Sequence, residues 1–191
     1  YACDPKRWHK FVELTQFADE WRDRIRFLAV SFKCNDTELT MPLPATMKGA
    51  PVKWLETNRS WTRSRNCNLL TSMIRPGARV LILDIDISIT DTALTNIVEK
   101  VRPGIIYFPI VWSMFSPQSI AYVELITKEQ VPPFSRDEGL WRKYAFGMTA
   151  FHADDVKKMH WDENFIGWGG EDNAFYNAAK NNPDLTVVRK H

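Results

Sequence analysis

The stretch Leu-Ile-Leu-Asp-Ile-Asp-Ile-Ser-Ile-Thr, residues 81–90, places two aspartates, Asp84 and Asp86, inside an otherwise apolar run. Residues 79–83 predict a strand, and the unbroken apolar run 81–83 is typical of a strand buried on both faces in the centre of a parallel sheet. Burying an unpaired carboxylate is costly, so we expect the strand to end near Asp84. Both carboxylates then stand at the sheet edge where open α/β sheets bind ligands.

The rest of the chain alternates between the two kinds of regular structure. Apolar residues at helical spacing predict helices over residues 10–21 and 91–101. Further helices are predicted over residues 64–74, ended by Arg75-Pro76-Gly77, over 153–159, and from about 171 to 180. Apolar runs predict further strands over residues 25–32, 52–55, 105–112, 144–151 and 185–188. Prolines and polar residues predict loops over residues 34–52 and 113–138. This alternation predicts one α/β domain spanning residues 1–191.

Composition excludes several classes of function. The chain has 191 residues, 45% of them hydrophobic, and a net charge of +2, which gives no support for a nucleic-acid-binding surface. No apolar run approaches the roughly 18 residues of a membrane span. Cys3, Cys34 and Cys67 are an odd number, which fits either free thiols or one disulfide with a spare thiol.

The two aspartates of residues 84–86 are the first candidate site. Residues i and i+2 of an extended chain point to the same side, so both carboxylates can face one ligand. Their oxygens suit Mg²⁺ or Mn²⁺ bound together with substrate phosphates. The alternative is a polar strand end in which one aspartate caps the next turn.

The second candidate is Gly-Trp-Gly-Gly-Glu-Asp, residues 167–172. Its glycines permit a sharp turn and close approach of the backbone to a ligand. Trp168 offers a flat apolar face suited to a sugar ring, and Glu171 and Asp172 open a helix. Carboxylates there gain roughly 0.3–1 kcal/mol from the helix dipole. The alternative is a glycine turn whose acidic residues only start the helix.

Four blocks of the chain resemble the metal-dependent glycosyltransferases that build chondroitin, the N-acetylgalactosaminyltransferases, and more distantly the β-1,4-galactosyltransferases. The blocks are VLILDID at 80–86, IYFPIVWS at 106–113, GLWRKYAFGMT at 139–149, and GWGGED at 167–172 with its continuation through Phe175-Tyr176. Their order and spacing agree with the family, which is more specific than either acidic motif alone.

The resemblance implies a GT-A fold, a Rossmann-like mixed sheet flanked by helices, and inverting transfer from a UDP-sugar. It implies Mn²⁺ or Mg²⁺ at Asp86, the nucleotide sugar at Asp84 and Arg65, and the acceptor at Trp168, Gly169, Gly170 and Glu171. Asp172 would be the general base. A carboxylate at a helix start is kept ionised, so we expect Asp172 to be a weak base. Residues 84–86 and 171–172 should then line one cleft.

The resemblance also sets expectations for the whole protein. N-acetylgalactosamine is the favoured donor sugar, a glycosaminoglycan chain end is the acceptor, and no nucleic acid is involved. The full-length protein is expected in the Golgi lumen as a type II membrane protein. The chain is expected to be a fragment truncated at both ends, lacking the family's first strand and the metal-binding histidine beyond the last one.

Two other functions remain open. A non-catalytic glycosyltransferase-like partner or binding module fits a chain that lacks those parts. A haloacid-dehalogenase-type phosphatase would use Asp84 as nucleophile and Asp86 as acid/base. It is the more distant alternative because Phe108-Pro109-Ile110 supplies no hydroxyl at the second strand end.

Overall fold

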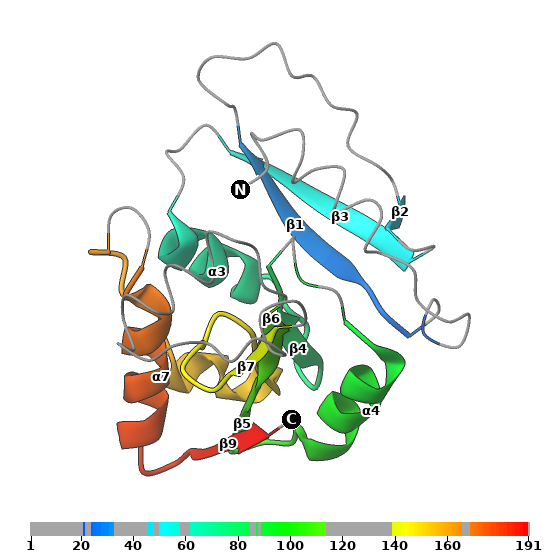
Figure 1. The fold of residues 1–191 in the computed structure, drawn as a ribbon. Coiled ribbons are helices and arrows are strands. Elements are labelled where there is room, and N and C mark those ends of the chain that lie inside the picture. Colours follow the sequence, from blue (N-terminus) through cyan, green and yellow to red (C-terminus); the bar gives the residue numbers. More distant parts are fainter. Residues whose placement is uncertain are drawn as a thin grey trace.

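The computed structural model shows an α/β protein whose elements follow the chain in the order drawn in Figure 1. It describes residues 21, 24–32, 46–47, 50–57, 62–84, 87, 89–113, 139–165 and 169–190. Within these ranges no helix has the length and apolar character needed to cross a membrane.

A four-stranded mixed sheet forms the centre, in the order β4-β8-β5-β9. It consists of β4 (Arg79–Ile82), β8 (Thr149–His152), β5 (Ile105–Pro109) and β9 (Thr186–Lys190). β8 is antiparallel to both β4 and β5, whereas β5 and β9 are parallel. The mixed sheet with flanking helices is consistent with the expected GT-A-like fold.

Helices cover the two faces of this sheet (Figure 1). On one face, Ile106 and Phe108 of β5 pack with Phe175 of α7 (Glu171–Asn181) and Cys67 of α3 (Arg63–Thr71). On the other face, Tyr107 packs against α4 (Asp91–Lys100), which contributes Leu94 and Ile97. Alternate β5 residues therefore enter two separate cores, as the two-residue period of a strand requires.

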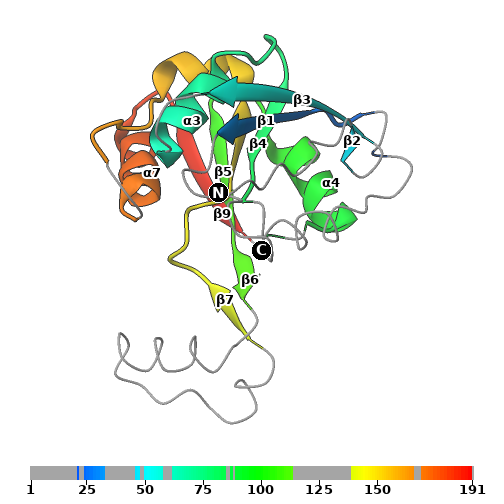
Figure 2. The same cartoon turned by 90° about the horizontal axis from the view of Figure 1, so that it is seen from above.

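A second sheet lies above the first in Figure 1, in the order β1-β3-β2. Its strands are β1 (Phe27–Phe32), β3 (Ala50–Thr57) and β2 (Thr46–Met47). β1 is parallel to β3, with Phe27 opposite Val52 and Phe32 opposite Thr57. Figure 2 shows β6 (Val111–Ser113) and β7 (Leu140–Arg142), an antiparallel pair, extending away from both sheets.

Several predicted elements are confirmed. The 3-10 helix η1 (Ala153–Lys158) and helices α3, α4 and α7 lie where helices were predicted. Strands β1, β3 and β9 overlap the predicted strands, although β3 is longer than residues 52–55. Ser113, the first residue of the loop predicted over residues 113–138, ends β6, and the rest of that loop lies outside the described residues. The helix predicted over residues 10–21 lies outside them too, apart from helical Trp21.

Three predictions about strands are wrong. Only residues 149–151 of the strand expected over residues 144–151 form a strand, β8, whereas residues 143–148 lie outside any strand. The strand expected over residues 105–112 breaks at Ile110 into β5 and β6. Among the described strands β4 lies at an edge of the sheet, antiparallel to its neighbour, and Leu81 and Ile82 are only half-buried. Residues 46–47 and 50–52, expected in a loop, form β2 and the start of β3.

Candidate functional site

Arg63 joins two aspartates that come from separate sequence motifs. Its Nε donates to Oδ1 of Asp172 at 2.9 Å, and its Nη1 donates to Oδ1 of Asp84. Its Nη2 donates to the carbonyl oxygen of Gly147. Asp84 follows β4, Asp172 lies in the first turn of α7, and Arg63 begins α3, so three distant segments meet at one guanidinium.

The start of α3 explains why Arg63 is placed there. Thr62 is the N-cap, and its hydroxyl accepts a hydrogen bond from the backbone N–H of Arg65 at 3.3 Å. No acidic residue lies in the first turn of α3, and Arg63 there faces the unfavourable positive end of the helix dipole. The carboxylates of Asp84 and Asp172 offset this unfavourable charge.

Gly147 lets the carboxylates approach each other. A Cβ atom at this position would lie 3.2 Å from Oδ2 of Asp84 and 3.2 Å from Oδ2 of Asp172. Few real Cβ contacts are that close. The second oxygens of both carboxylates therefore lie on the same side of Gly147, where any larger residue would crowd them.

The glycine turn before α7 forms as predicted. Gly169 and Gly170 have φ values of 97° and 91°, a region that L-residues with side chains rarely adopt. A Cβ at Gly170 would also come within 2.9 Å of the Phe165 ring. Glu171 then begins α7 with only 4% of its surface exposed, and its Oε2 has no hydrogen-bond partner among the described residues.

Burial and the neighbouring charges shift the pKa of Asp172 in different directions. Burial raises its pKa, as do the neighbouring Glu171 and Asp84 carboxylates, while Arg63 lowers it; the net pKa is raised above its ordinary value. The expectation of a weak base held ionised by the helix dipole is therefore wrong, because desolvation dominates. For Arg63, burial opposes the charge but the two aspartates outweigh it and raise the pKa.

Cys67 lies one turn after Arg63 in α3. It is a free, buried thiol. This fits both alternatives for the three cysteines, because Cys67 can also be the spare thiol beside one disulfide. Burial raises its pKa to about 12, with Arg63 acting in the opposite direction. The thiol is therefore protonated and packs as part of the core.

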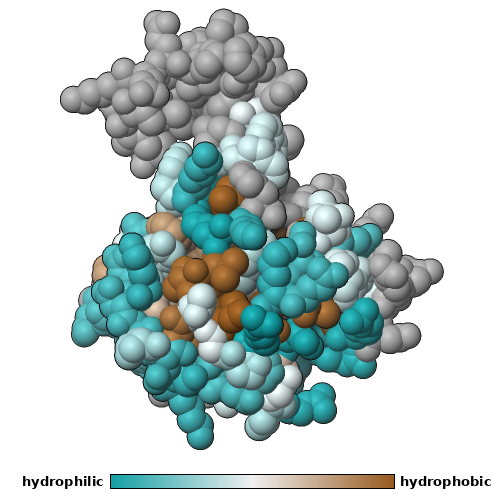
Figure 3. Space-filling model, turned by 90° about the horizontal axis from the view of Figure 1, so that it is seen from below, coloured by the Kyte–Doolittle hydropathy of each residue, from teal (hydrophilic) through white to brown (hydrophobic). Residues whose placement is uncertain are grey.

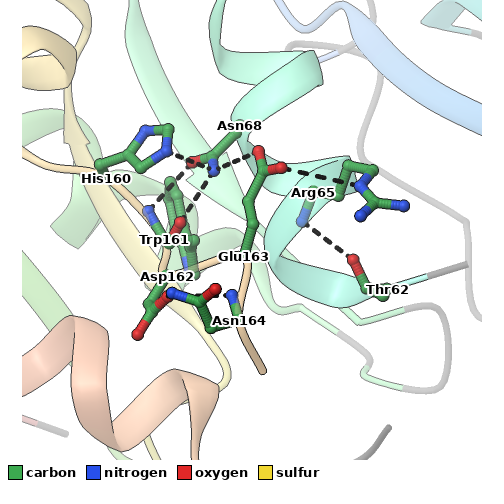
Figure 4. A network of polar contacts seen from close by, with 8 residues as sticks. All are labelled: Thr62, Arg65, Asn68, His160, Trp161, Asp162, Glu163 and Asn164. Atoms are coloured by element: carbon green, nitrogen blue, oxygen red, sulfur yellow. Dashed lines mark hydrogen bonds and ion pairs between the residues drawn. The ribbon is translucent and has the colours of Figure 1, made fainter. Parts of the chain in front are cut away.

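A network of polar contacts ties α3 to the loop before the glycine turn (Figure 4). The side chain of Asn68 pairs with the backbone of Trp161, accepting from its N–H at 3.0 Å and donating to its carbonyl at 2.9 Å. The Nδ2 of Asn68 also lies 3.0 Å from Oε1 of Glu163 and 3.0 Å from Nε2 of His160. The indole of Trp161 stacks on Phe175 of α7, with 3.8 Å between ring centres.

Arg65, predicted to contact the nucleotide sugar, belongs to this network. Its Nε lies 3.6 Å from Oε2 of Glu163, so its side chain faces the loop of residues 160–164. Arg63, two residues earlier, is the arginine that contacts Asp84. A nucleotide-binding role for Arg65 stays a prediction.

Arg189 of β9 contacts residues 142–146, the segment that leads to Gly147. Its Nη2 donates to the carbonyls of Arg142 at 3.0 Å and Ala145 at 2.9 Å. Its Cζ lies 4.4 Å from the centre of the Phe146 ring. The turn over residues 143–147 is thus fixed by side-chain donors, because its carbonyls lack strand partners.

The described residues hold only part of the predicted site. Asp84 and Asp172 meet at Arg63, Glu171 is buried at the start of α7, and Gly169 and Gly170 form the turn before it. Asp86, the predicted metal ligand, and Trp168 lie outside the described residues. Within the described residues no three His, Cys, Asp or Glu side chains gather in a group able to hold a metal ion. Arg63 and Gly147 are site residues that were not predicted from the sequence.

Comparison with known proteins agrees with this geometry. The sequence model of the family described as "Chondroitin N-acetylgalactosaminyltransferase" matches residues 32–191. The chain is 29% identical over 142 residues to human chondroitin sulfate N-acetylgalactosaminyltransferase 2, covering 69% of this chain and 25% of that protein. It is 27% identical over 202 residues to human chondroitin sulfate N-acetylgalactosaminyltransferase 1, covering 96% of this chain and 37% of that protein.

A relative with a different name matches as well. The chain is 24% identical over 150 residues to mouse chondroitin sulfate synthase 3, covering 74% of this chain and 16% of that protein. The chain therefore spans well under half the length of each of these relatives. Since the family match covers most of the sequence, including both acidic motifs, the chain belongs to the chondroitin N-acetylgalactosaminyltransferase family.

Proposed function

We propose that the protein containing this chain is an inverting glycosyltransferase that moves a sugar, with N-acetylgalactosamine favoured, from a UDP-sugar to the end of a glycosaminoglycan chain. The observation that carries the proposal is the meeting of Asp84 and Asp172 at Arg63. It brings a residue of the predicted donor site beside the predicted base, as transfer between two substrates requires.

Asp172 is the proposed general base. Its carboxylate accepts the proton of the acceptor hydroxyl as that oxygen bonds to the anomeric carbon and UDP leaves from the opposite face. The raised pKa makes Asp172 a better proton acceptor than an ordinary aspartate. Arg63 holds Oδ1 of Asp172 at 2.9 Å and thereby orients the carboxylate.

The donor side of the site would hold a divalent cation, Mn²⁺ or Mg²⁺. The carboxylate oxygens of Asp84 and Asp86 are the hard donors that these ions prefer, and Asp84 is 31% exposed in its side chain, so its carboxylate is accessible. When bound, the cation would stabilise the charge on the departing diphosphate. Arg63 keeps Asp84 oriented and offsets its charge.

The acceptor side would be formed by Glu171, Gly169 and Gly170, with Trp168 beside them. The buried Oε2 of Glu171 has no described hydrogen-bond partner, and a sugar hydroxyl that reached it would supply the missing donor. Placement of the full-length protein in the Golgi lumen with a membrane anchor is part of the same proposal and rests on the resemblance alone.

Turnover of UDP-sugars by the full-length protein tests the proposal. With Mn²⁺ and an acceptor ending in glucuronate, we expect transfer of N-acetylgalactosamine and release of UDP. Absence of transfer from every UDP-sugar, together with metal-independent or absent UDP binding in calorimetry, would instead support a non-catalytic binding module. The Arg63–Asp172 pair gives that alternative some support, because it occupies one oxygen of the proposed base.

A further inference from the structure

A pocket of about 280 Å³ lies at β9, on the α4 side of the central sheet. The described residues that line it are Glu99, Lys100, Arg102, Ile105, Val188 and Lys190. None of these belongs to the Arg63 site. Figure 3 looks onto the side of the molecule where the ends of α4, β5 and β9 lie in Figure 1, and it shows apolar residues surrounded by hydrophilic ones.

The register of the sheet fixes the floor and one wall of this pocket. Val188 lies opposite Tyr107 in the parallel pairing of β5 and β9, and Lys190 lies opposite Pro109. Because side chains two residues apart in a strand share a face, Val188 and Lys190 both face the α4 side. Ile105 begins β5 and is half-buried, so it completes an apolar floor with Val188.

Cations dominate the rim. Lys100 ends α4, where its Nζ donates to Oδ1 of Asn96 at 2.6 Å and lies 5.6 Å from the centre of the Tyr107 ring. Arg102 and Lys190 are exposed, and within the described part of the chain neither forms an ion pair. Glu99 is the one acid in the described lining. The rim therefore has a local excess of positive charge in a chain whose net charge is only +2.

The helix dipole explains only part of this charge. A lysine in the last turn of α4 is favourable for the helix, which accounts for Lys100. Lys190 comes from β9, about ninety residues later in the sequence, so the preference of the last helical turn for a cation does not account for its presence. Cations from two unrelated elements around one apolar floor instead favour a bound anion with an apolar face.

Resting on the proposed function, we propose that this pocket is a second binding site for the acidic glycan, holding a uronic acid residue remote from the chain end that is extended. The C–H face of the sugar ring would cover Ile105 and Val188, and its carboxylate would pair with Arg102 and Lys190. A bare inorganic anion would leave the apolar floor in water. The pocket is close to the lower size limit of small-molecule sites, about 300 Å³, which suits one sugar residue.

The test uses the full-length protein and the variant R102E/K190E. The matched control is K157E/K180E, which makes the same charge change at exposed lysines of η1 and α7. We expect KM for a long chondroitin acceptor to rise about tenfold in the pocket variant, with kcat and the KM for a disaccharide acceptor unchanged. The control should match the wild-type protein with both acceptors.

Calorimetric titration of a chondroitin hexasaccharide, without donor, separates this inference from the proposed function. Binding that is lost in R102E/K190E and in the neutral variant R102Q/K190Q, but kept in the control, supports the second site even if no sugar is transferred. Equal weakening in the control and pocket variants would overturn it, since that outcome shows general attraction by charge. Unchanged binding in both pocket variants would overturn it too, as would inorganic phosphate displacing the hexasaccharide at equal concentration.

Discussion

Asp172 is the side chain on which the proposed chemistry depends. Replacing it by asparagine keeps an oxygen that can accept from Arg63 Nε but removes the proton acceptor. We expect Asp172→Asn to lower kcat by about 10²–10⁴-fold, the usual contribution of a positioned general base. Initial rates of sugar transfer measure this. Asp162→Asn, an exposed carboxylate whose described contacts are with Asn164, should keep wild-type kcat. Equal kcat in both variants would remove Asp172 from the mechanism.

Gly147 tests the closeness of the two carboxylates. In Gly147→Ala the new Cβ crowds Oδ2 of both aspartates, and Arg63 restrains them from moving away. We expect a loss of about 1–3 kcal/mol in the free energy of unfolding, as for other overpacked positions, and weaker metal-dependent binding of UDP. Chemical denaturation and calorimetry measure the two effects.

Gly77→Ala is the comparison for that variant. Gly77 has φ of 78°, but a Cβ there meets nothing within 4 Å, so alanine introduces backbone strain without crowding. It should lower stability and leave UDP binding unchanged. If Gly147→Ala bound UDP as tightly as the wild-type protein does, the geometry of the two carboxylates would not contribute to donor binding.

Sequence alone could predict the aspartates but not the arginine between them. Asp84 interrupts an apolar strand and Asp172 follows a glycine turn, and both are costly features that call for a ligand or a partner. Arg63 lies in an ordinary polar run whose one anomaly is a cation in the first turn of a helix that lacks acidic residues there. That anomaly indicates that some partner is required, whereas the identity of the partner depends on the tertiary fold.

At the scale of elements, Asn68 connects α3 to the loop that leads to α7. Asn68→Ala removes the partners of both backbone polar groups of Trp161 and one donor to Glu163. We expect a loss of about 1–3 kcal/mol in the free energy of unfolding, because partly buried backbone groups lose their hydrogen bonds. Urea denaturation measures it. Asn164→Ala, whose described contacts are only with Asp162, should change stability by less than about 0.5 kcal/mol; equal losses would contradict a linking role for Asn68.

The accuracy of the predicted elements depended on how each one is stabilised. Helix α4 buries one apolar stripe, so its periodic spacing predicted it correctly. Helix α7 was predicted from the glycine motif before it and the two acidic residues that open it. The aromatic run Tyr144-Ala145-Phe146 looked like a strand, but it forms turns because Arg189 and Arg63 supply the donors for the carbonyls of Ala145 and Gly147. Those donors come from distant parts of the chain, and no local pattern in the run reveals them.

For the molecule as a whole, the raised pKa of Asp172 links stability to pH. The folded protein holds the Asp172 proton more tightly than the unfolded chain, so this residue favours folding most when it is protonated in both states. That contribution is complete below about pH 4 and is lost as pH rises from the ordinary aspartate pKa through the raised folded pKa. Asp172→Asn cannot titrate and should be less affected over the same range.

The measurement is the free energy of unfolding of the wild-type protein and of Asp172→Asn from pH 3 to pH 7. We expect the wild-type value minus the variant value to fall as pH rises through the acid range and then to level off. The same subtraction with Asp162→Asn gives the background from a surface carboxylate. A difference that grows with pH would mean that Arg63, rather than burial, dominates the energetics of Asp172. Asp172 would then be the weak base expected from its place at a helix start, and its proposed catalytic role would lose the support of its environment.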